Sequence, residues 1–110
     1  MNLQYSERRV NGALILDIDG KLDVSSGNDL EKVIEQLAGK GEQKIVLNMQ
    51  AVSYVDSAGI GSIIKSSQML IGKGAELRMA ALQGRVLEIF QSNNLHRHVG
   101  IYPSEEEAVQ

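Results

Sequence analysis

The sequence has no cysteine, and this absence removes several classes of site at once. A disulfide framework, a thiolate nucleophile and a cysteine-ligated zinc site all need residues that the chain does not have. Tryptophan is also absent and Phe90 is the only phenylalanine, so few aromatic rings are available to stack on nucleic-acid bases. The chain also has no excess of basic residues, because its 11 Lys and Arg residues are outnumbered by 14 Asp and Glu residues. We therefore expect no direct binding of nucleic acid.

The sequence also has no long apolar run. No stretch approaches the roughly 20 consecutive apolar residues of a transmembrane helix, and residues 1–9 contain charges without the apolar core of a signal peptide. These features predict a cytoplasmic protein without a membrane span, and the lack of cysteine fits a reducing compartment. The length of 110 residues is typical of one domain, so residues 1–110 are predicted to form a single domain.

The first part of the chain is predicted to form a β-hairpin. Residues 3–9 alternate loosely and residues 13–18 are apolar, which is typical of two strands. Asn11-Gly12 between them is a strong signal for a two-residue turn. Asp19-Gly20 is expected to end the second strand.

Periodic apolar positions predict the first helix. We expect its start at Ser26, because Asp29 follows three residues later at the spacing of a capping box. Gly39 and Gly41 are expected to end it. Its buried face repeats at the helical spacing through Leu30, Val33, Ile34 and Leu37.

Strands and helices continue to alternate in the second part. Residues 44–49 are rich in β-branched and apolar side chains and are too short for a helix, so they predict a buried strand. A second helix is predicted after Asp56, with Ile60, Ile63, Ile64 and Ile71 on one stripe. The remaining predicted elements are a strand over 75–82, a helix over 85–91, a strand over 98–102 and a terminal helix capped by Ser104. This order predicts an α/β fold with a mixed, mainly parallel sheet, an N-terminal hairpin and about four helices.

The most informative segment runs from Asp56 to Gly61, where a turn after a buried strand opens the second helix. Asp56 is a suitable N-cap, and Ser57 would then be the first helical residue. The free N–H groups and the dipole of a helix N-terminus favour negative charge, so a phosphate attached to Ser57 would be stabilised there. Gly59 and Gly61 are expected to leave this end open to another surface. Ordinary helix capping explains the same residues, and the residues alone leave both interpretations open.

An enzymatic role for Ser57 is a third interpretation. A serine nucleophile needs a base held by a third group and an oxyanion hole. The segment lacks the Gly-x-Ser-x-Gly elbow, and only His96 and His98 could supply an imidazole base. Two histidines without a third ligand also make a poor metal site. We therefore expect no enzyme activity, no catalytic residue, no metal and no cofactor.

The chain resembles the STAS domain family, named after sulfate transporters and anti-sigma factor antagonists. The resemblance covers residues 3–109 and is most specific at the Asp-Ser-x-Gly-x-Gly segment, residues 56–61. Supporting matches lie at 20–23, 44–48, 52–55, 74–77 and 86–90. Among its members, the chain is most similar to the stand-alone bacterial anti-sigma factor antagonists.

This resemblance implies a phosphorylation-controlled partner switch. It implies that Ser57 is the phosphorylated residue, and Ala58 stands where many relatives carry a second acceptor. The implied partners are an anti-sigma factor with serine kinase activity, which binds the unphosphorylated chain and releases a sigma factor, and a PP2C-type phosphatase. The implied partner surface consists of Asp23, Asp56, Ser57, Ala58, Gly59, Ile60 and Gly61. A scaffold or regulatory subunit of a transporter or stress-sensing complex remains an alternative.

Overall fold

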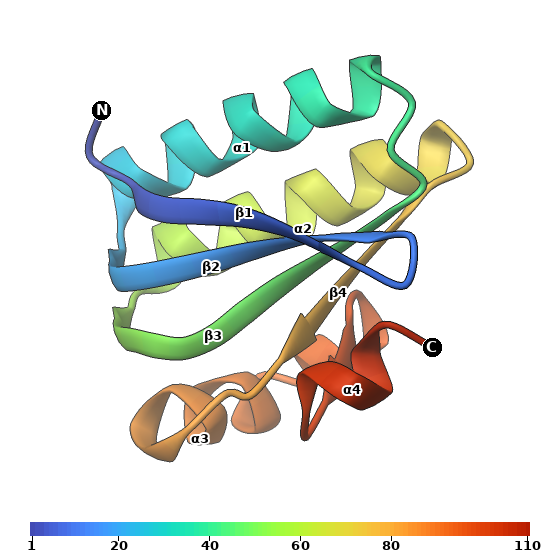
Figure 1. Ribbon diagram of the computed structural model, residues 1–110. Coiled ribbons are helices and arrows are strands. Elements are labelled where there is room, and N and C mark those ends of the chain that lie inside the picture. Colours follow the sequence, from blue (N-terminus) through green and yellow to red (C-terminus); the bar gives the residue numbers. More distant parts are fainter.

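Strands alternate with helices along the whole chain, as a computed structural model covering residues 1–110 shows (Figure 1). The five strands form one sheet in the order β1-β2-β3-β4-β5. β1 and β2 are antiparallel, and every other neighbouring pair is parallel. The elements are β1 (Gln4–Val10), β2 (Ala13–Leu22), α1 (Val24–Gly39), β3 (Lys44–Val55), α2 (Ser57–Gly72), β4 (Glu76–Ala80), α3 (Gly84–Ser92), the 3-10 helix η1 (Leu95–Arg97), β5 (Gly100–Tyr102) and α4 (Glu105–Ala108). The predicted α/β class, mixed sheet, hairpin and four helices are confirmed.

The hairpin turn is where the sequence signal placed it. Asn11 and Gly12 have φ values of 51° and 81°, the positive values that a two-residue turn with the twist of its strands requires. The turn fixes the register of β1 on β2, with Val10 opposite Ala13 and Gln4 opposite Asp19.

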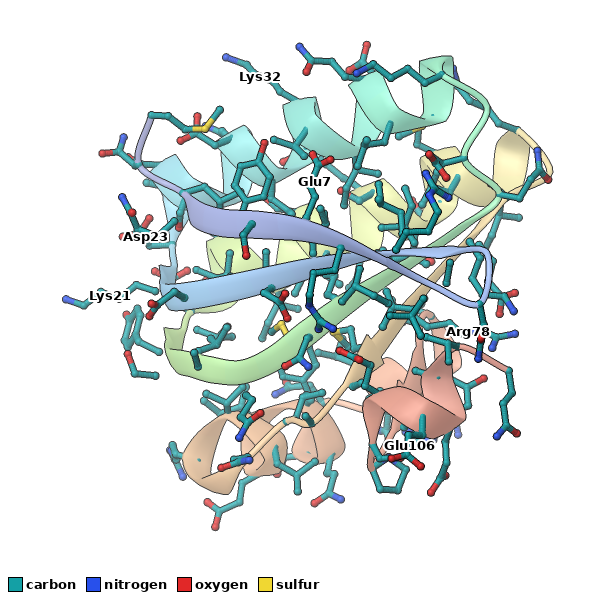
Figure 2. All side chains as sticks on the ribbon, in the orientation of Figure 1. Glu7, Lys21, Asp23, Lys32, Arg78 and Glu106 are labelled. Carbon is teal, nitrogen blue, oxygen red and sulfur yellow. The ribbon has the colours of Figure 1, made fainter.

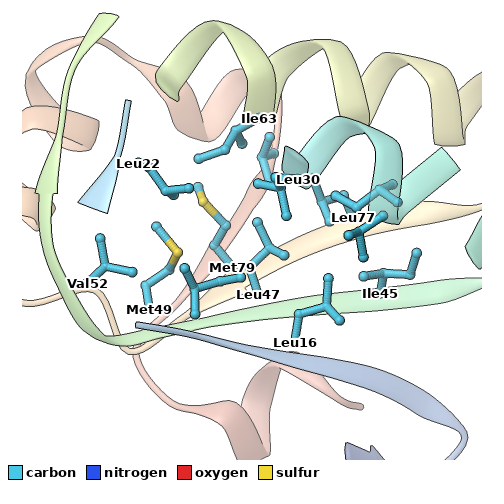
Figure 3. Close-up of a cluster of buried hydrophobic side chains, with 14 of the residues drawn as sticks. Leu16, Leu22, Leu30, Ile45, Leu47, Met49, Val52, Ile63, Leu77 and Met79 are labelled. Atoms are coloured by element: carbon cyan, nitrogen blue, oxygen red, sulfur yellow. The ribbon is translucent and has the colours of Figure 1, made fainter. Parts of the chain in front are cut away.

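Two layers of unequal size cover the two faces of the sheet. α1 and α2 lie side by side on one face, and both begin at the edge where β2 and β3 end (Figure 1). The larger core fills the space between these helices and the strands, with Leu16, Leu30, Leu47, Ile63 and Met79 among its buried side chains (Figure 3). Phe90 of α3 is fully buried in the same cluster. A smaller core on the other face consists of Ala13, Ile15, Val46, Ala80, Ala108 and Val109.

β2 and β3 are longer than the sequence predicted. The expectation that Asp19-Gly20 ends β2 is wrong, because Gly20 takes a positive φ of 90° within a strand that continues to Leu22. Register shifts against β3 on both sides of this region mark a bulge that absorbs the glycine. β3 follows this extension as far as Val55, with Leu22 opposite Val55. The bulge therefore carries both strands to the place where the second helix starts.

The predicted stripe of α2 needs one correction. Ile63 is buried, and Ile60 and Ile64 pack partly buried against the core, as expected. Ile71 is instead 63% exposed, and Leu70 takes the buried position in the last turn. The stripe follows the 3.6-residue period, which places Leu70 rather than Ile71 seven residues after Ile63.

A polar network fixes α4 to the second face of the sheet. The guanidinium of Arg8 donates to both carboxylate oxygens of Asp17, at 2.6 and 2.8 Å, and to the carboxylate of Glu105. Asn48 Nδ2 also donates to Glu105 at 3.0 Å. These hydrogen bonds from Arg8, and then from Asn48, lower the pKa of Glu105 below its ordinary value. The side chains of Lys44 and Arg78 both donate to the backbone carbonyl of Gln110, the last residue.

None of the helices combines the length and the apolar character that crossing a lipid bilayer requires.

Candidate functional site at the start of α2

The two long helices start from neighbouring strand ends. Leu22 and Val55 are register partners on the parallel strands β2 and β3, so the next residues, Asp23 and Asp56, leave the same edge of the sheet. Asp23 is the N-cap of α1 and Asp56 is the N-cap of α2. The backbone N–H of Asp56 donates to the carbonyl of Leu22 at 3.2 Å. One backbone hydrogen bond therefore links the two helix starts.

Asp56 and Ser57 have the positions that the sequence predicted. The Asp56 side chain accepts a hydrogen bond of 3.0 Å from the backbone N–H of Gly59. Ser57 is the first residue of α2, and it is exposed. The capping interpretation is therefore correct for Asp56, while the Ser57 hydroxyl stays accessible to another protein.

Asp23, and not Ser26, caps α1. The Asp23 carboxylate accepts from the backbone N–H groups of Ser25 and Ser26, both at 3.1 Å, and Ser26 Oγ accepts from the Asp23 N–H at 2.9 Å. The predicted helix start at Ser26, with a capping box between Ser26 and Asp29, is thus wrong by one turn, because α1 begins directly after the end of β2 at Leu22. The hydrogen bonds from Ser26, followed by that from Ser25, lower the pKa of Asp23. Asp29 instead accepts from the backbone N–H groups of Asn2 and Leu3.

The two glycines of the motif have different roles. A Cβ built on Gly59 would lie 2.2 Å from the carbonyl oxygen of Leu22, so this glycine is needed for packing of α2 on the end of β2. A Cβ built on Gly61 would meet nothing within 4 Å. The expectation that both leave the surface open is therefore wrong for Gly59, which is buried, and correct for Gly61.

Two exposed apolar side chains lie beside the site and were not predicted from the sequence. Val24, the first residue of α1, is 61% exposed, and Tyr54, near the end of β3, is 46% exposed. Lys21 Nζ lies 6.0 Å from the Tyr54 ring centroid, and Lys21 and Asp23 project near the end of β2 (Figure 2). A longer strand prediction would have flagged Tyr54, since it precedes the inward-facing Val55 and so points to the other face. Val24 and Tyr54 therefore place apolar surface next to the two helix starts.

The remaining residues of the predicted partner surface are Ala58, Ile60 and Gly61, and of these Ile60 packs partly buried against the core. Ala58 and Gly61 line a shallow groove between α1 and α2. His96 lies in η1 and His98 follows it, and both are exposed. The His98 carbonyl accepts from Ser67 Oγ at 2.8 Å, which puts its backbone ten residues along α2 from Ser57, about 15 Å at the rise of a helix. No group of three potential metal ligands occurs.

The chain is similar in sequence or fold to several known proteins. An anti-sigma-B factor antagonist of Staphylococcus aureus is 27% identical over 95 residues, which are 86% of this chain and 88% of the relative. A crystal structure from Thermotoga maritima, of a candidate anti-sigma factor antagonist, superposes with a TM-score of 0.85 at 25% identity and covers 94% of this chain and 90% of that one. The phosphorylated form of the Bacillus cell fate determinant SpoIIAA has the same fold, with a TM-score of 0.71 at 18% identity and 96% of both chains covered.

The family model described as the STAS domain matches residues 5–108, nearly the whole chain. That span includes both helix starts and the segment from Asp56 to Gly61. The chain therefore belongs to the STAS domain family.

Proposed function

We propose that the chain is an anti-sigma factor antagonist whose binding is controlled by phosphorylation of Ser57. The observation that carries this proposal is an exposed serine at the first position of α2, at the sheet edge where α1 and α2 both start and are each capped by an aspartate. The names of the relative from S. aureus and of the neighbour from T. maritima support the antagonist role. The phosphorylated Bacillus neighbour supports a covalent switch on this fold.

A phosphate on Ser57 would change the charge of this surface more than its shape. Phosphoserine adds about −1.5 to −2 charges at neutral pH, and neither Asp23 nor Asp56 is in an ion pair. A partner that buries this surface would have to remove water from the phosphate and from two uncompensated carboxylates. The helix N-terminus stabilises the phosphate within the protein, so no refolding is required.

The unphosphorylated surface offers the complementary features. Val24 and Tyr54 supply apolar contact area, and the open position at Gly61 lets another backbone approach α2 closely. Ala58 cannot accept a phosphate, which leaves Ser57 as the acceptor in the motif. The proposed partner is an anti-sigma factor with serine kinase activity, and a PP2C-type phosphatase would restore Ser57.

Binding measurements with charge variants test this function. A pull-down with the wild-type chain as bait identifies the anti-sigma factor, and calorimetry then compares Ser57→Ala with Ser57→Asp. We expect Ser57→Ala to bind like the wild type and Ser57→Asp to bind at least about tenfold more weakly, which corresponds to about 1.4 kcal/mol. Gln68→Glu is the matched control, because it adds one charge at an exposed position of the same helix.

Tandem mass spectrometry after incubation of the chain with the retained kinase and ATP gives an independent test. The proposal requires phosphate on Ser57. Stoichiometric phosphate on Ser25 or Ser53 with Ser57 unmodified would end this assignment, and equal affinities of the Ser57→Ala and Ser57→Asp variants would end the charge-based switch.

A further inference from the structure

Asn11 and Gly12, the two residues of the turn between β1 and β2, are held by no hydrogen bond of their own. Both are exposed and have positive φ values. Neither residue donates or accepts a backbone hydrogen bond outside the paired strands. A Cβ built on Gly12 would meet nothing within 4 Å, so the surrounding protein does not shield the turn. The side-chain amide of Asn11 and the backbone N–H of Gly12 are therefore free and in contact with water.

These two groups can react with each other. A bond from the backbone nitrogen of Gly12 to Cγ of Asn11 closes a five-membered ring, which contains no atom from any other residue. Gly12 has no side chain that would hinder this approach. No hydrogen bond of the two turn residues has to break, so ring closure requires only rotations within the turn.

We propose that Asn11 is a site of covalent modification by deamidation. The Gly12 nitrogen bonds to Asn11 Cγ, the Cγ–Nδ2 bond breaks, and the amide group leaves as ammonia with the proton of the Gly12 N–H. Water then opens the succinimide ring. Attack at Cγ gives aspartate, and attack at the main-chain carbonyl carbon gives isoaspartate, in which the main chain passes through Cβ and Cγ. One water enters and one ammonia leaves, without an oxidant or a cofactor.

None of the other asparagines combines these features. Asn48 and Asn93 hold their side-chain amides in hydrogen bonds, to the Glu105 carboxylate at 3.0 Å and to the Ile89 carbonyl at 2.7 Å. The remaining asparagines lie inside a helix or precede a buried leucine: Asn28 within α1, Asn2 before Leu3 and Asn94 before Leu95. The reaction is therefore expected at Asn11 first.

The two products have different effects on the hairpin. Aspartate leaves the main chain unaltered and tolerates a positive φ, so Val10 stays opposite Ala13. Isoaspartate lengthens the main chain of a two-residue turn by one carbon, and the turn length sets the strand register. Arg8, three residues before the turn, bonds to Asp17 on β2 and to Glu105 on α4. The isoaspartyl product should therefore loosen both the hairpin and α4.

The turn is far from the candidate functional site. β2 separates them, and its ends at Ala13 and Leu22 are nine residues apart, about 30 Å at the rise of a strand. We therefore expect Asn11→Asp, which reproduces the aspartyl product, to leave the affinity for the anti-sigma factor unchanged. The deamidation itself needs no partner, so its test is independent of the proposed function.

Mass spectrometry of the folded chain, incubated at mildly alkaline pH and sampled over time, tests the proposal. Trypsin cuts after Arg9 and Lys21, and the peptide of residues 10–21 contains Asn11 as its only asparagine. We expect this peptide to gain the mass difference between OH and NH2 and to separate into two products on chromatography. Peptides that contain the other asparagines should change at least about tenfold more slowly, because none of those asparagines precedes a glycine.

Two variants and two synthetic peptides complete the test. Asn11→Asp has no amide to lose and should show no change of mass in the peptide of residues 10–21. Gly12→Ala should slow the reaction at least about tenfold, since its Cβ hinders the approach of the nitrogen. Synthetic peptides of residues 10–21, with Gly12 and with the Gly12→Ala change, separate this chemical effect from any loss of the fold. A rate at Asn11 no higher than at the other asparagines, or an equal rate in Gly12→Ala, would overturn the proposal.

Discussion

The α-carbon of Gly59 lies directly against the main-chain carbonyl of Leu22. A Cβ at Gly59 would approach the Leu22 oxygen to 2.2 Å and the carbonyl carbon to 2.8 Å. The same carbonyl accepts the backbone N–H of Asp56 at 3.2 Å. Close backbone contacts thus join the first turn of α2 to the end of β2.

Replacement of Gly59 should therefore destabilise the protein. Since the Leu22 carbonyl is backbone and cannot turn aside, we expect Gly59→Ala to lower the free energy of unfolding by about 1–3 kcal/mol, the usual range for overpacking. Chemical denaturation measures this change. The matched control is Gly61→Ala, whose Cβ enters open space and gains helix propensity, so its stability should be unchanged or higher by up to about 1 kcal/mol.

A larger side chain at Gly61 should weaken partner binding without loss of stability. Nothing lies within 4 Å of a Cβ there, so Gly61→Leu is accommodated by the free protein but projects into the surface where we propose that the anti-sigma factor docks. Calorimetry and thermal unfolding of the same variant decide the matter. Unaltered affinity would place the docking surface elsewhere, and lost stability would contradict the open environment of Gly61.

The cap of α2 should be replaceable by an isosteric side chain. Asp56→Ala removes the acceptor of the Gly59 N–H and should lower the free energy of unfolding by about 1 kcal/mol. Asp56→Asn keeps an oxygen at that position and should lose only a small part of this amount. Urea denaturation at neutral pH compares the variants, and equal losses for Ala and Asn would show that charge, and not the hydrogen bond, is what matters.

Asp23 should contribute stability that disappears in acid. Its pKa is lowered in the folded protein by the hydrogen bonds from Ser26 and Ser25, so the ionised form stabilises the fold. This contribution is fully present above the ordinary value of 3.8 and is lost as the pH falls through the lowered pKa. The difference in unfolding free energy between wild type and Asp23→Asn should therefore shrink below about pH 4. A difference that does not change with pH below about 4 would contradict this role of Asp23.

The attachment of α4 should depend on Glu105. Glu105→Gln weakens the charged hydrogen bonds to Arg8 and Asn48, and because these groups are partly exposed the expected loss is only about 1 kcal/mol. Hydrogen exchange should become faster in α4 and remain unchanged at the start of α2. Faster exchange in both regions would instead mean that α4 supports the whole fold.

The sequence predicted the fold best where two independent signals coincided. The hairpin had both strand patterns and the Asn11-Gly12 turn, and the structure confirms it within a residue at most ends. The sequence predicted the extent of β2 and β3 poorly. A glycine such as Gly20 is equally compatible with a turn that ends a strand and with a bulge inside a longer strand. Pairing with the neighbouring strand decides between the two, and that information is not local.

The candidate site shows the same limit. The positions of Asp56 and Ser57 followed from short-range capping rules, which need only a few consecutive residues. The distinct roles of Gly59 and Gly61 depend instead on which atoms of β2 lie opposite each glycine. The packing of α2 against its neighbours creates those environments, and the order of residues within α2 does not contain them.

The exposed position of Ser57 on a well-packed helix has a kinetic consequence. A modifying enzyme meets the hydroxyl in the native protein, so the rate of modification depends on encounter between folded molecules and not on transient opening of the chain. Variants that stabilise or destabilise the distant core would change the opening rate by orders of magnitude and leave this reaction almost untouched. The response time of such a switch is thereby uncoupled from the thermodynamic stability of the domain that carries it.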